Sequence, residues 1–503
     1  MPEFDKATAL DPARSVVIEA CAGSGKTWLL VSRILRLLLD GVAPGEILAI
    51  TFTRKAAQEM EARLRDWLEK LATLEDAEVD AFLLERAVPA ADLERLRPLA
   101  RGLLERLLTA DPGLTLNTFP GWFWQLLRLA PLESGYGGAP SLVEATSPLI
   151  EEAWQSFAED LQDTPQSPVA QALDTLFADA GLHNTRVLLE DFIARRAEWW
   201  AYTQGQPDPV AWALAQLRAA WRVDTQADPL AALFATPELA EAMQAYHAFL
   251  AGNTASDQKL ADRLAAARAE SSPEARFGGV CGVLFTADGK PRARSASKAQ
   301  AGRLGGEEKE RRFLDLHASL CARFDATRQE LATQAAYRFN AAAIACGAAL
   351  LAHYQELKAA ANALDFGDVE WRACRLLADS DHAEYMQYKL GTRYRHILLD
   401  EFQDTNPLQW QALKAWLDAS AAAGLPPRVF LVGDPKQSIY RFRRAEPRLF
   451  DSAAAFLQAG YGAVKLAQNA SFRCAPAVIA ALNRVFAAEE DYRLFQPHVA
   501  VQR

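Results

Sequence analysis

The fold is decided by the stretch Ser15-Val-Val-Ile-Glu-Ala-Cys-Ala-Gly-Ser-Gly-Lys-Thr27. An apolar strand runs into a glycine-bearing loop that ends in Lys-Thr, and the residues that follow predict a helix over 28–39. The bare backbone N–H groups of such a loop, with the N-terminus of the next helix, surround the phosphates of a nucleotide. We therefore predict a nucleotide-binding α/β domain built around this loop.

Two side chains of the loop have direct roles. Lys26 reaches the β and γ phosphates of ATP, and the Thr27 hydroxyl can ligate Mg²⁺. Ala20 stands where the usual pattern has its first glycine. The alternative is a chance turn after a buried strand, which the strand-loop-helix context disfavours. We assign nucleotide binding to the whole loop, which consists of Ala20, Cys21, Ala22, Gly23, Ser24, Gly25, Lys26 and Thr27.

Composition describes a globular chain of two or three domains. The 503 residues are 50% apolar and 23% charged, with a formal net charge of −10, which argues against coating DNA by bulk charge but leaves room for a local groove. No apolar run of about eighteen residues is uninterrupted, and no secretory signal precedes the loop, so we predict a cytoplasmic protein without a membrane partner. The six cysteines form no C-x-x-C pair, which argues against zinc ribbons and a disulfide framework.

Three textures divide the chain. Strand–helix alternation is interrupted by a long helical segment and then resumes, so we expect a parallel α/β core split by a mostly helical insertion. The predicted parts are 1–135 and 351–465 for the core, 136–350 for the insertion, and 466–503 for the start of a second domain. Within the insertion, residues 278–306 favour a solvated flexible loop over a dedicated DNA contact, and 195–200 (Arg-Arg-Ala-Glu-Trp-Trp) favour helix packing over a grip on duplex DNA.

Paired carboxylates follow the predicted strand 396–399. Asp400 stands where a phosphate-loop enzyme holds Mg²⁺, and Glu401 can orient and deprotonate the attacking water. On its own an Asp-Glu pair after apolar residues is a weak signal.

A second predicted strand, 429–432, leads into a turn with polar, aromatic and basic residues. Gln437 offers a neutral donor to the γ phosphate, and Tyr440, Phe442 and Arg443 suit a single strand, because rings stack on bases and guanidinium groups hold phosphates. The alternative is a core Tyr/Phe pair beside a solvated arginine face, and residue types alone do not decide between them. Phe52 and Thr53 end another strand, where open α/β sheets bind ligands.

These motifs together resemble a known family. A-x-A-G-S-G-K-T, T-F-T-x-K-A-A-x-E-M, D-E-F-Q-D-T and G-D-P-K-Q-S-I-Y-x-F-R occur in the order of motifs I, Ia, II and III of the UvrD/Rep helicases of superfamily 1. The D-P-K-Q wording, Asn117-Thr-Phe119, Leu364-Asp-Phe-Gly-Asp368 and the long insertion resemble its RecB/AddA branch. Ser471-Phe-Arg-Cys-Ala-Pro476 resembles motif IV.

The resemblance implies an ATP- and Mg²⁺-dependent motor that translocates 3′ to 5′ on single-stranded DNA or at a single-strand/duplex junction, in recombinational repair of double-strand breaks. It implies that Arg473 joins Lys26, Glu401 and Gln437 in catalysis, and that Thr118 and Phe119 join the strand-binding residues. A nuclease or helicase subunit of the AddB type is the implied partner. The alternative is a nucleotide-gated DNA-binding subunit without motor activity.

Two departures from the family pattern affect these expectations. Residues 1–14 hold no glutamine that could read adenine. No counterpart of motifs V and VI follows motif IV, so we expect the amino-terminal part of a longer translocase, able to bind nucleotide and slow to hydrolyse it.

Overall fold

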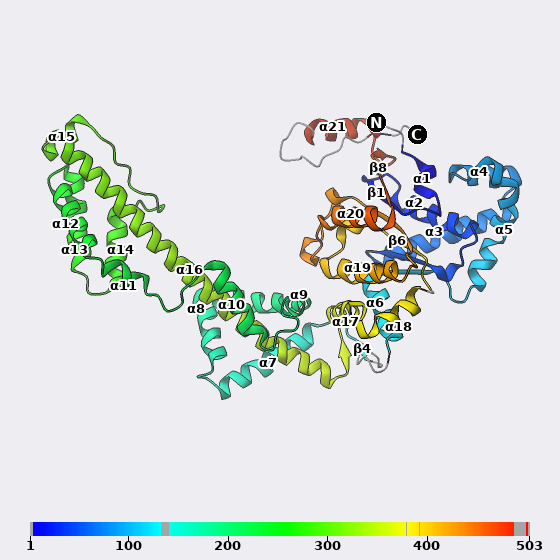
Figure 1. Ribbon diagram of the computed structural model, residues 1–503, viewed down its shortest axis with the longest axis horizontal. Helices are drawn as coiled ribbons and strands as arrows, with labels where there is room; N and C mark the ends of the chain where they lie inside the picture. The colour runs from blue at the N-terminus through cyan, green and yellow to red at the C-terminus, as the bar shows by residue number, and fades with distance from the viewer. Residues whose placement is uncertain (1–3, 132–139, 379, 392, 487–498, 501–503) are drawn as a thin grey trace. The chain divides into compact units, whose positions relative to one another are not determined.

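The computed structural model describes residues 4–131, 140–378, 380–391, 393–486 and 499–500. They form two compact units, one of residues 1–146 with 358–503 and one of residues 147–357, which we name the core unit and the helical unit (Figure 1). The core unit contains a parallel sheet and the helical unit contains helices. The predicted α/β core interrupted by a helical insertion is therefore confirmed.

The core unit is organised by a six-stranded sheet with the strand order β3-β2-β6-β7-β1-β8, parallel throughout. The strands are β1 (Val16–Ala20), β2 (Ile47–Thr51), β3 (Thr115–Thr118), β6 (His396–Leu399), β7 (Arg428–Gly433) and β8 (Val464–Gln468). Strands from before the insertion (β1, β2 and β3) and after it (β6, β7 and β8) are interleaved in this order, so the two halves of the sequence share one sheet. Because the strands are parallel, their carboxyl ends lie at one edge, where the motifs meet.

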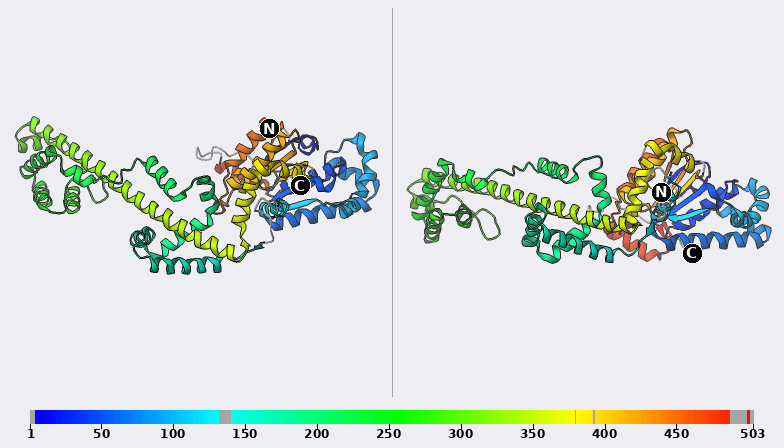
Figure 2. Two further views of the ribbon diagram at one scale, coloured as in Figure 1. Left: turned by 60° about the horizontal axis from the view of Figure 1, so that its bottom comes forward. Right: turned by 90° about the horizontal axis from the view of Figure 1, so that it is seen from below.

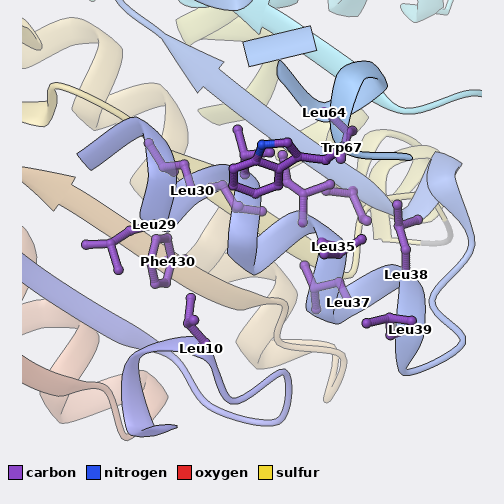
Figure 3. Packing of buried hydrophobic residues seen from close by; sticks show 14 of the residues in the cluster. Leu10, Leu29, Leu30, Leu35, Leu37, Leu38, Leu39, Leu64, Trp67 and Phe430 are labelled. Carbon is purple, nitrogen blue, oxygen red and sulfur yellow. The ribbon is translucent and has the colours of Figure 1, made fainter. Parts of the chain in front are cut away.

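One face of the sheet is covered by helices that precede β3. They are α1 (Lys6–Leu10), α2 (Lys26–Leu39), α3 (Arg54–Thr73), α4 (Asp76–Glu85) and α5 (Leu93–Thr109). The leucines of α2 pack with Leu10, Leu64, Trp67 and Phe430 in one buried cluster (Figure 3). Burial of such side chains stabilises a fold by about 1.5–3 kcal/mol each, so this cluster fixes α2 and the loop before it against the sheet.

The other face is covered mainly by helices that follow the insertion. They are α17 (Phe366–Ala378), α18 (Ser380–Gly391), α19 (Pro407–Ala422) and α20 (Leu449–Tyr461), joined by α6 (Phe119–Leu129). Aromatic rings connect them, with Trp122 and Trp416 at 5.7 Å and Phe402 and Phe450 at 6.5 Å between centroids. Short 3₁₀ turns complete the connections: η1 (Pro44–Glu46), η2 (Ala90–Asp92), η4 (Phe402–Asp404), η5 (Pro435–Gln437) and η6 (Arg441–Arg443).

The insertion leaves and re-enters the core unit at adjacent points. The short strands β4 (Ser141–Leu142) and β5 (Ala363–Leu364) pair in parallel, with Ser141 opposite Ala363. Beside them the buried Lys358 ammonium lies 3.2 Å from Asp365 Oδ2 and 2.5 Å from Asp368 Oδ2. A buried charge is tolerated only when it is paired in this way, so the ion pairs fix the point where the chain returns.

The helical unit is organised along the long helix α16 (Glu307–Ala360) (Figure 2). Its amino-terminal half packs in one cluster with α12 (Pro237–Ala251), α13 (Ala255–Ala269), α14 (Pro273–Leu284) and α15 (Lys298–Leu304). Its carboxyl-terminal half packs in a second cluster with α7 (Ser147–Asp163), α8 (Pro168–Ala194) and α9 (Arg196–Tyr202). The remaining helices are α10 (Pro209–Trp221) and α11 (Pro229–Phe234).

One stretch of α16 is long and apolar enough to cross a membrane by length and composition alone, and 28% of that stretch is buried. The central helices of soluble proteins meet the same criterion. Since both halves of α16 contribute side chains to the cores just described, this finding is weak evidence for a membrane span.

The carboxyl-terminal segment lies against the core sheet. β8 crosses the predicted domain boundary between 465 and 466 and pairs with β1, so the sheet of the first domain reaches Gln468. It is followed by β9 (Ala470–Ser471), which pairs with β10 (Val499–Ala500), and by α21 (Pro476–Phe486). The division of the chain into four parts otherwise stays a prediction.

Candidate nucleotide site and strand-binding surface

The predicted phosphate loop joins β1 to α2. Gly23 and Gly25 adopt left-handed backbone conformations, with φ of 73° and 85°, and Gly25 is the N-cap of α2. These values favour glycine, because a β-carbon is strained there. Ala20, Cys21 and Ser24 are buried, so their contribution to a bound nucleotide is made by the backbone. Burial raises the pKa of the Cys21 thiol to about 11, which keeps it protonated and unreactive.

A cavity of about 940 Å³ opens over this loop. It brings together six of the predicted residues from three separate segments of the chain: Gly23, Gly25, Lys26, Thr27, Glu401 and Arg473. The full lining is Gly23, Gly25, Lys26, Thr27, Trp28, Arg63, Glu401, Phe472, Arg473, Cys474, Ala475 and Pro476. A cradle of backbone N–H groups beside lysine and arginine side chains suits a polyphosphate.

Lys26 and Glu401 form an ion pair at the floor of the cavity. Lys26 Nζ donates to Glu401 Oε2 at 2.7 Å, and the lysine side chain is only 10% exposed. Glu401 itself has a left-handed backbone, with φ of 48°, and directly follows Asp400 at the end of β6. The side chains predicted to bind phosphate and to activate water therefore lie within contact of one another.

Asp400 fits a cation. Burial, reinforced by the adjacent Glu401 carboxylate, raises the pKa of Asp400 to about 7. A carboxylate that is poorly stabilised as an anion gains from a metal ion beside it. Within the part of the chain that the structure describes, no three His, Cys, Asp or Glu side chains form a metal cluster. Asp400 carries the hard oxygen ligand that Mg²⁺ prefers, and it is not among the residues that line the cavity.

Arg473 reaches the cavity because its segment is hydrogen-bonded to the phosphate loop. The Phe472 N–H donates to the Gly23 carbonyl at 2.8 Å, and Ser471 Oγ donates to the Ala22 carbonyl at 3.1 Å. A β-carbon on Gly23 would lie 2.5 Å from Arg473 Cβ, so only glycine permits this approach. Sequence spacing does not indicate this contact.

Gln437 is not among the residues that line the cavity. It lies in η5, after β7, and its Nε2 donates to Asp434 Oδ2 at 2.5 Å. Asp434 is buried and also accepts from the Lys436 N–H at 3.1 Å. The predicted γ-phosphate contact of Gln437 would therefore require its amide to leave Asp434.

The predicted strand-binding residues differ in how much surface they present. Phe442 is 76% exposed, which contradicts the core-packing alternative for this ring. Phe52 and Tyr440 are half-buried, with ring centroids 4.5 Å apart, and Tyr440 lies 5.7 Å from Phe442. Three rings from the segments that follow β2 and β7 thus lie together, and we name Phe52, Tyr440 and Phe442 the aromatic surface.

The other predicted strand contacts have structural roles. Thr53 and Thr118 accept hydrogen bonds from backbone N–H groups as N-caps of α3 and α6. Thr118 and Phe119 are only 7% and 8% exposed, so their side chains offer a strand little to contact. The backbone of Arg443 belongs to η6, and its side chain lies outside the described residues.

Six of the residues that line the cavity were not predicted as site residues: Trp28, Arg63, Phe472, Cys474, Ala475 and Pro476. Trp28, Arg63 and Phe472 line the cavity from α2, α3 and the segment after β9. Arg63 lies on the helix that follows motif Ia, far from any glycine-rich signature, so only the packing of α3 beside α2 brings it there. A further buried amide, Gln403, also escaped prediction.

The helical unit corrects one expectation and confirms another. Residues 278–306 are not a flexible loop: α14 and α15 cover much of the stretch, Arg292 donates to the Val283 carbonyl at 3.0 Å, and Arg294 pairs with Asp257 at 2.6 Å. Arg292 and Arg294 are therefore inward hydrogen-bond donors, whereas Lys290 is solvated as expected, with its side chain 81% exposed. The predicted packing role of 195–200 is confirmed, because Arg196 is buried 5.5 Å from the centroid of the Tyr354 ring.

Comparison with known proteins agrees with this arrangement. The UvrD/REP helicase N-terminal domain family matches residues 2–96 and 231–457, more than half of the chain. The chain is 29% identical to an ATP-dependent helicase/nuclease subunit of Levilactobacillus brevis and 30% identical to its namesake in Desulforudis audaxviator, over 90% and 94% of its length. It spans only 36% and 38% of those curated relatives. With its phosphate loop, acidic pair and parallel sheet in the order described, the chain belongs to the UvrD/Rep helicase family.

Proposed function

We propose that this chain is the ATP-binding part of a DNA helicase motor that moves 3′ to 5′ along single-stranded DNA during repair of double-strand breaks. One observation carries the proposal. A single cavity gathers the phosphate loop, Lys26, Glu401 and Arg473 from segments far apart in sequence. Such convergence suits hydrolysis of a nucleotide rather than simple storage of one, because a scaffold needs neither a water-activating carboxylate nor a second cation.

The residues divide the work of hydrolysis. Lys26 pairs with Glu401 at 2.7 Å, and a γ phosphate would draw Lys26 away and leave the carboxylate able to accept a proton from water. Arg473 would face the phosphate from the opposite wall and stabilise the charge that develops on it. Mg²⁺, held by Thr27 and Asp400, would neutralise phosphate charge.

The aromatic surface would bind the second ligand of a motor, which is the DNA strand. Phe52, Tyr440 and Phe442 can stack on bases without regard to sequence. Gln437 and Tyr440 lie on the same connection after β7, so a change at the γ phosphate can move the residues that hold the strand. Arg443 is proposed to hold phosphates of the same strand.

We infer a partner and a place in the cell, and the names of the relatives support the first of these. Their names describe one subunit of an ATP-dependent helicase/nuclease. We extend this to the present chain, which would work with a second subunit of the AddB type where single-stranded DNA meets duplex. We place this complex in the cytoplasm with the DNA, without a membrane span.

Single-turnover hydrolysis of labelled ATP, with and without a single-stranded oligonucleotide, tests the proposal. We expect the chain to bind ATP and the oligonucleotide, and to hydrolyse ATP slowly, at a rate that Glu401→Gln lowers to a small residual. Loss of an arginine supplied in trans typically slows such reactions by about 10³ or more, so the rate is read with protein in excess. A chain that binds no nucleotide, or whose rate of hydrolysis is unchanged by Glu401→Gln, would refute the assignment.

A further inference from the structure

Gln403 is a buried amide with both ends engaged. It lies in η4, directly after the acidic pair, and is 2% exposed. Its Nε2 donates to Glu401 Oε2 at 2.7 Å, and its Oε1 accepts from the Asp434 N–H at 2.8 Å. A buried amide that satisfies a donor and an acceptor on two different motifs has a fixed orientation.

We propose that Gln403 is a positioning residue for hydrolysis, which ties the Glu401 carboxylate to the turn that carries Gln437. The inference rests on the proposed function, since Glu401 must be the group that activates water. It assigns Gln403 no contact with nucleotide. Gln403 acts through Glu401.

The need for such a tie follows from the Lys26 ion pair. Glu401 Oε2 accepts from both Lys26 and Gln403 at 2.7 Å. When Lys26 moves to a phosphate, the carboxylate loses one of these two contacts, and its side chain is 35% exposed. The bond from Gln403 then holds the carboxylate in one rotamer while the water is activated. A small misplacement of a reacting group slows chemistry strongly.

The same amide reaches the connection of the predicted γ-phosphate contact. Asp434 connects the two glutamines. Its N–H donates to Gln403 Oε1, and its carboxylate Oδ2 accepts from Gln437 Nε2 at 2.5 Å. Ser438 Oγ, one residue beyond Gln437, donates to the Gln403 carbonyl at 3.2 Å. The fit is tight, since a β-carbon on Gly433 would lie 2.8 Å from Gln403 Oε1. Movement of Gln437 toward a γ phosphate would therefore be transmitted to Glu401.

The test compares Gln403→Ala and Gln403→Glu with the matched control Gln409→Ala. Gln403→Ala removes both contacts of the amide, whereas ionised Gln403→Glu keeps an acceptor for the Asp434 N–H, loses the donor to Glu401 and places a second negative charge beside that carboxylate. Gln409 lies in the first turn of α19, the helix that follows η4, and its Oε1 accepts from the Asn406 N–H at 3.2 Å in the capping box of that helix. Single-turnover ATP hydrolysis and the affinities for ADP and ATPγS are measured for each variant.

We expect both Gln403 variants to hydrolyse ATP about 10- to 100-fold more slowly, with nucleotide affinities changed by less than about threefold, and Gln409→Ala to match the wild type. In a Glu401→Gln background, Gln403→Ala should slow the residual reaction by less than about twofold, because residues that act as a unit are not additive. A structural role would instead weaken nucleotide binding and add to Glu401→Gln.

Two outcomes would overturn the proposal in distinguishable ways. Hydrolysis unchanged in Gln403→Glu, or slowed equally by Gln409→Ala, would refute the role of Gln403 while leaving Glu401 in place. A wild-type rate equal to that of Glu401→Gln would refute the proposed function itself, and the inference with it. Circular dichroism melting curves identify any variant that fails to fold, in which case Gln403→Glu, the nearly isosteric change, decides the matter.

Discussion

Gly23→Ala should damage both stability and nucleotide binding, and Gly41→Ala provides a matched control. Both glycines have left-handed backbones, with φ of 73° and 92°. A β-carbon on Gly41 meets nothing within 4 Å, whereas on Gly23 it would lie 2.5 Å from Arg473 Cβ and 3.0 Å from Ser471 Oγ. The two substitutions therefore share a backbone penalty of about 1–2 kcal/mol and differ in what the new methyl group displaces.

The additional cost at Gly23 follows from the contacts across the loop. Carbon atoms pack at about 3.5–4.0 Å, so Arg473 and its neighbours would have to retreat by roughly 1 Å. This would stretch the 2.8 Å bond from the Phe472 N–H to the Gly23 carbonyl beyond hydrogen-bonding distance. Loss of that bond and of the one from Ser471 costs about 0.5–1.5 kcal/mol each. We expect Gly23→Ala to lower the free energy of unfolding by about 1–3 kcal/mol more than Gly41→Ala does.

Urea denaturation and titration with a fluorescent ATP analogue measure the two effects. Displacement of Arg473 should weaken binding of the ATP analogue about tenfold or more, as expected for loss of a charge-assisted contact, while Gly41→Ala should bind normally. Equal stability and equal affinity in the two variants would show that the segment after β9 is not held against the phosphate loop.

Three further predictions address single features. Lys26→Met should weaken ATP binding roughly 100-fold. It should change the free energy of unfolding by less than about 1 kcal/mol, because the partly exposed Lys26–Glu401 pair contributes little to stability. Normal affinity in a nucleotide titration would contradict the phosphate-loop assignment. Phe442→Ala should weaken single-strand binding by about 1–3 kcal/mol whatever the base sequence. The control Ile439→Ala, at a similarly exposed position, should leave the affinity for single-stranded DNA unchanged. Fluorescence anisotropy with two oligonucleotides of different sequence measures both affinities. Burial and nearby arginines lower the pKa of His396 to about 4, so the contribution of neutral His396 to the free energy of unfolding is fully present above pH 6.5 and falls by roughly 3 kcal/mol as the pH falls from 6.5 to 4. His396→Gln should therefore reduce the dependence of the urea-denaturation midpoint on pH over this range. The same pH dependence in the wild type and the variant would refute the pKa shift.

Local sequence patterns predicted much of the core because each motif specifies the backbone conformation of its own residues. The strand 396–399 was predicted with its observed bounds, and the glycines before Lys26 indicated where α2 begins. Residues 278–306 were mispredicted because their glycine and arginine content was taken to indicate solvation. The partners of those arginines, such as Asp257, lie on other helices.

The same limit applies to the candidate site. Lys26, Thr27 and Glu401 could be nominated from residue type and position, and the cavity brings them together. Gln403 and Arg63 could not, since their contacts depend on side-chain direction and on packing between segments. The exposure of Phe442, which decided against its core-packing alternative, likewise needed coordinates.

The pairing of β4 with β5 has a consequence for how this chain can vary. Because Ser141 and Ala363 are paired neighbours, the entire insertion is a single loop whose two ends meet in the core unit. The entropy of closing a loop rises by only about 0.6 kcal/mol for each doubling of its length. Lengthening, shortening or replacing the inserted helices therefore costs the nucleotide-binding core almost nothing, so the two units are free to diverge at different rates.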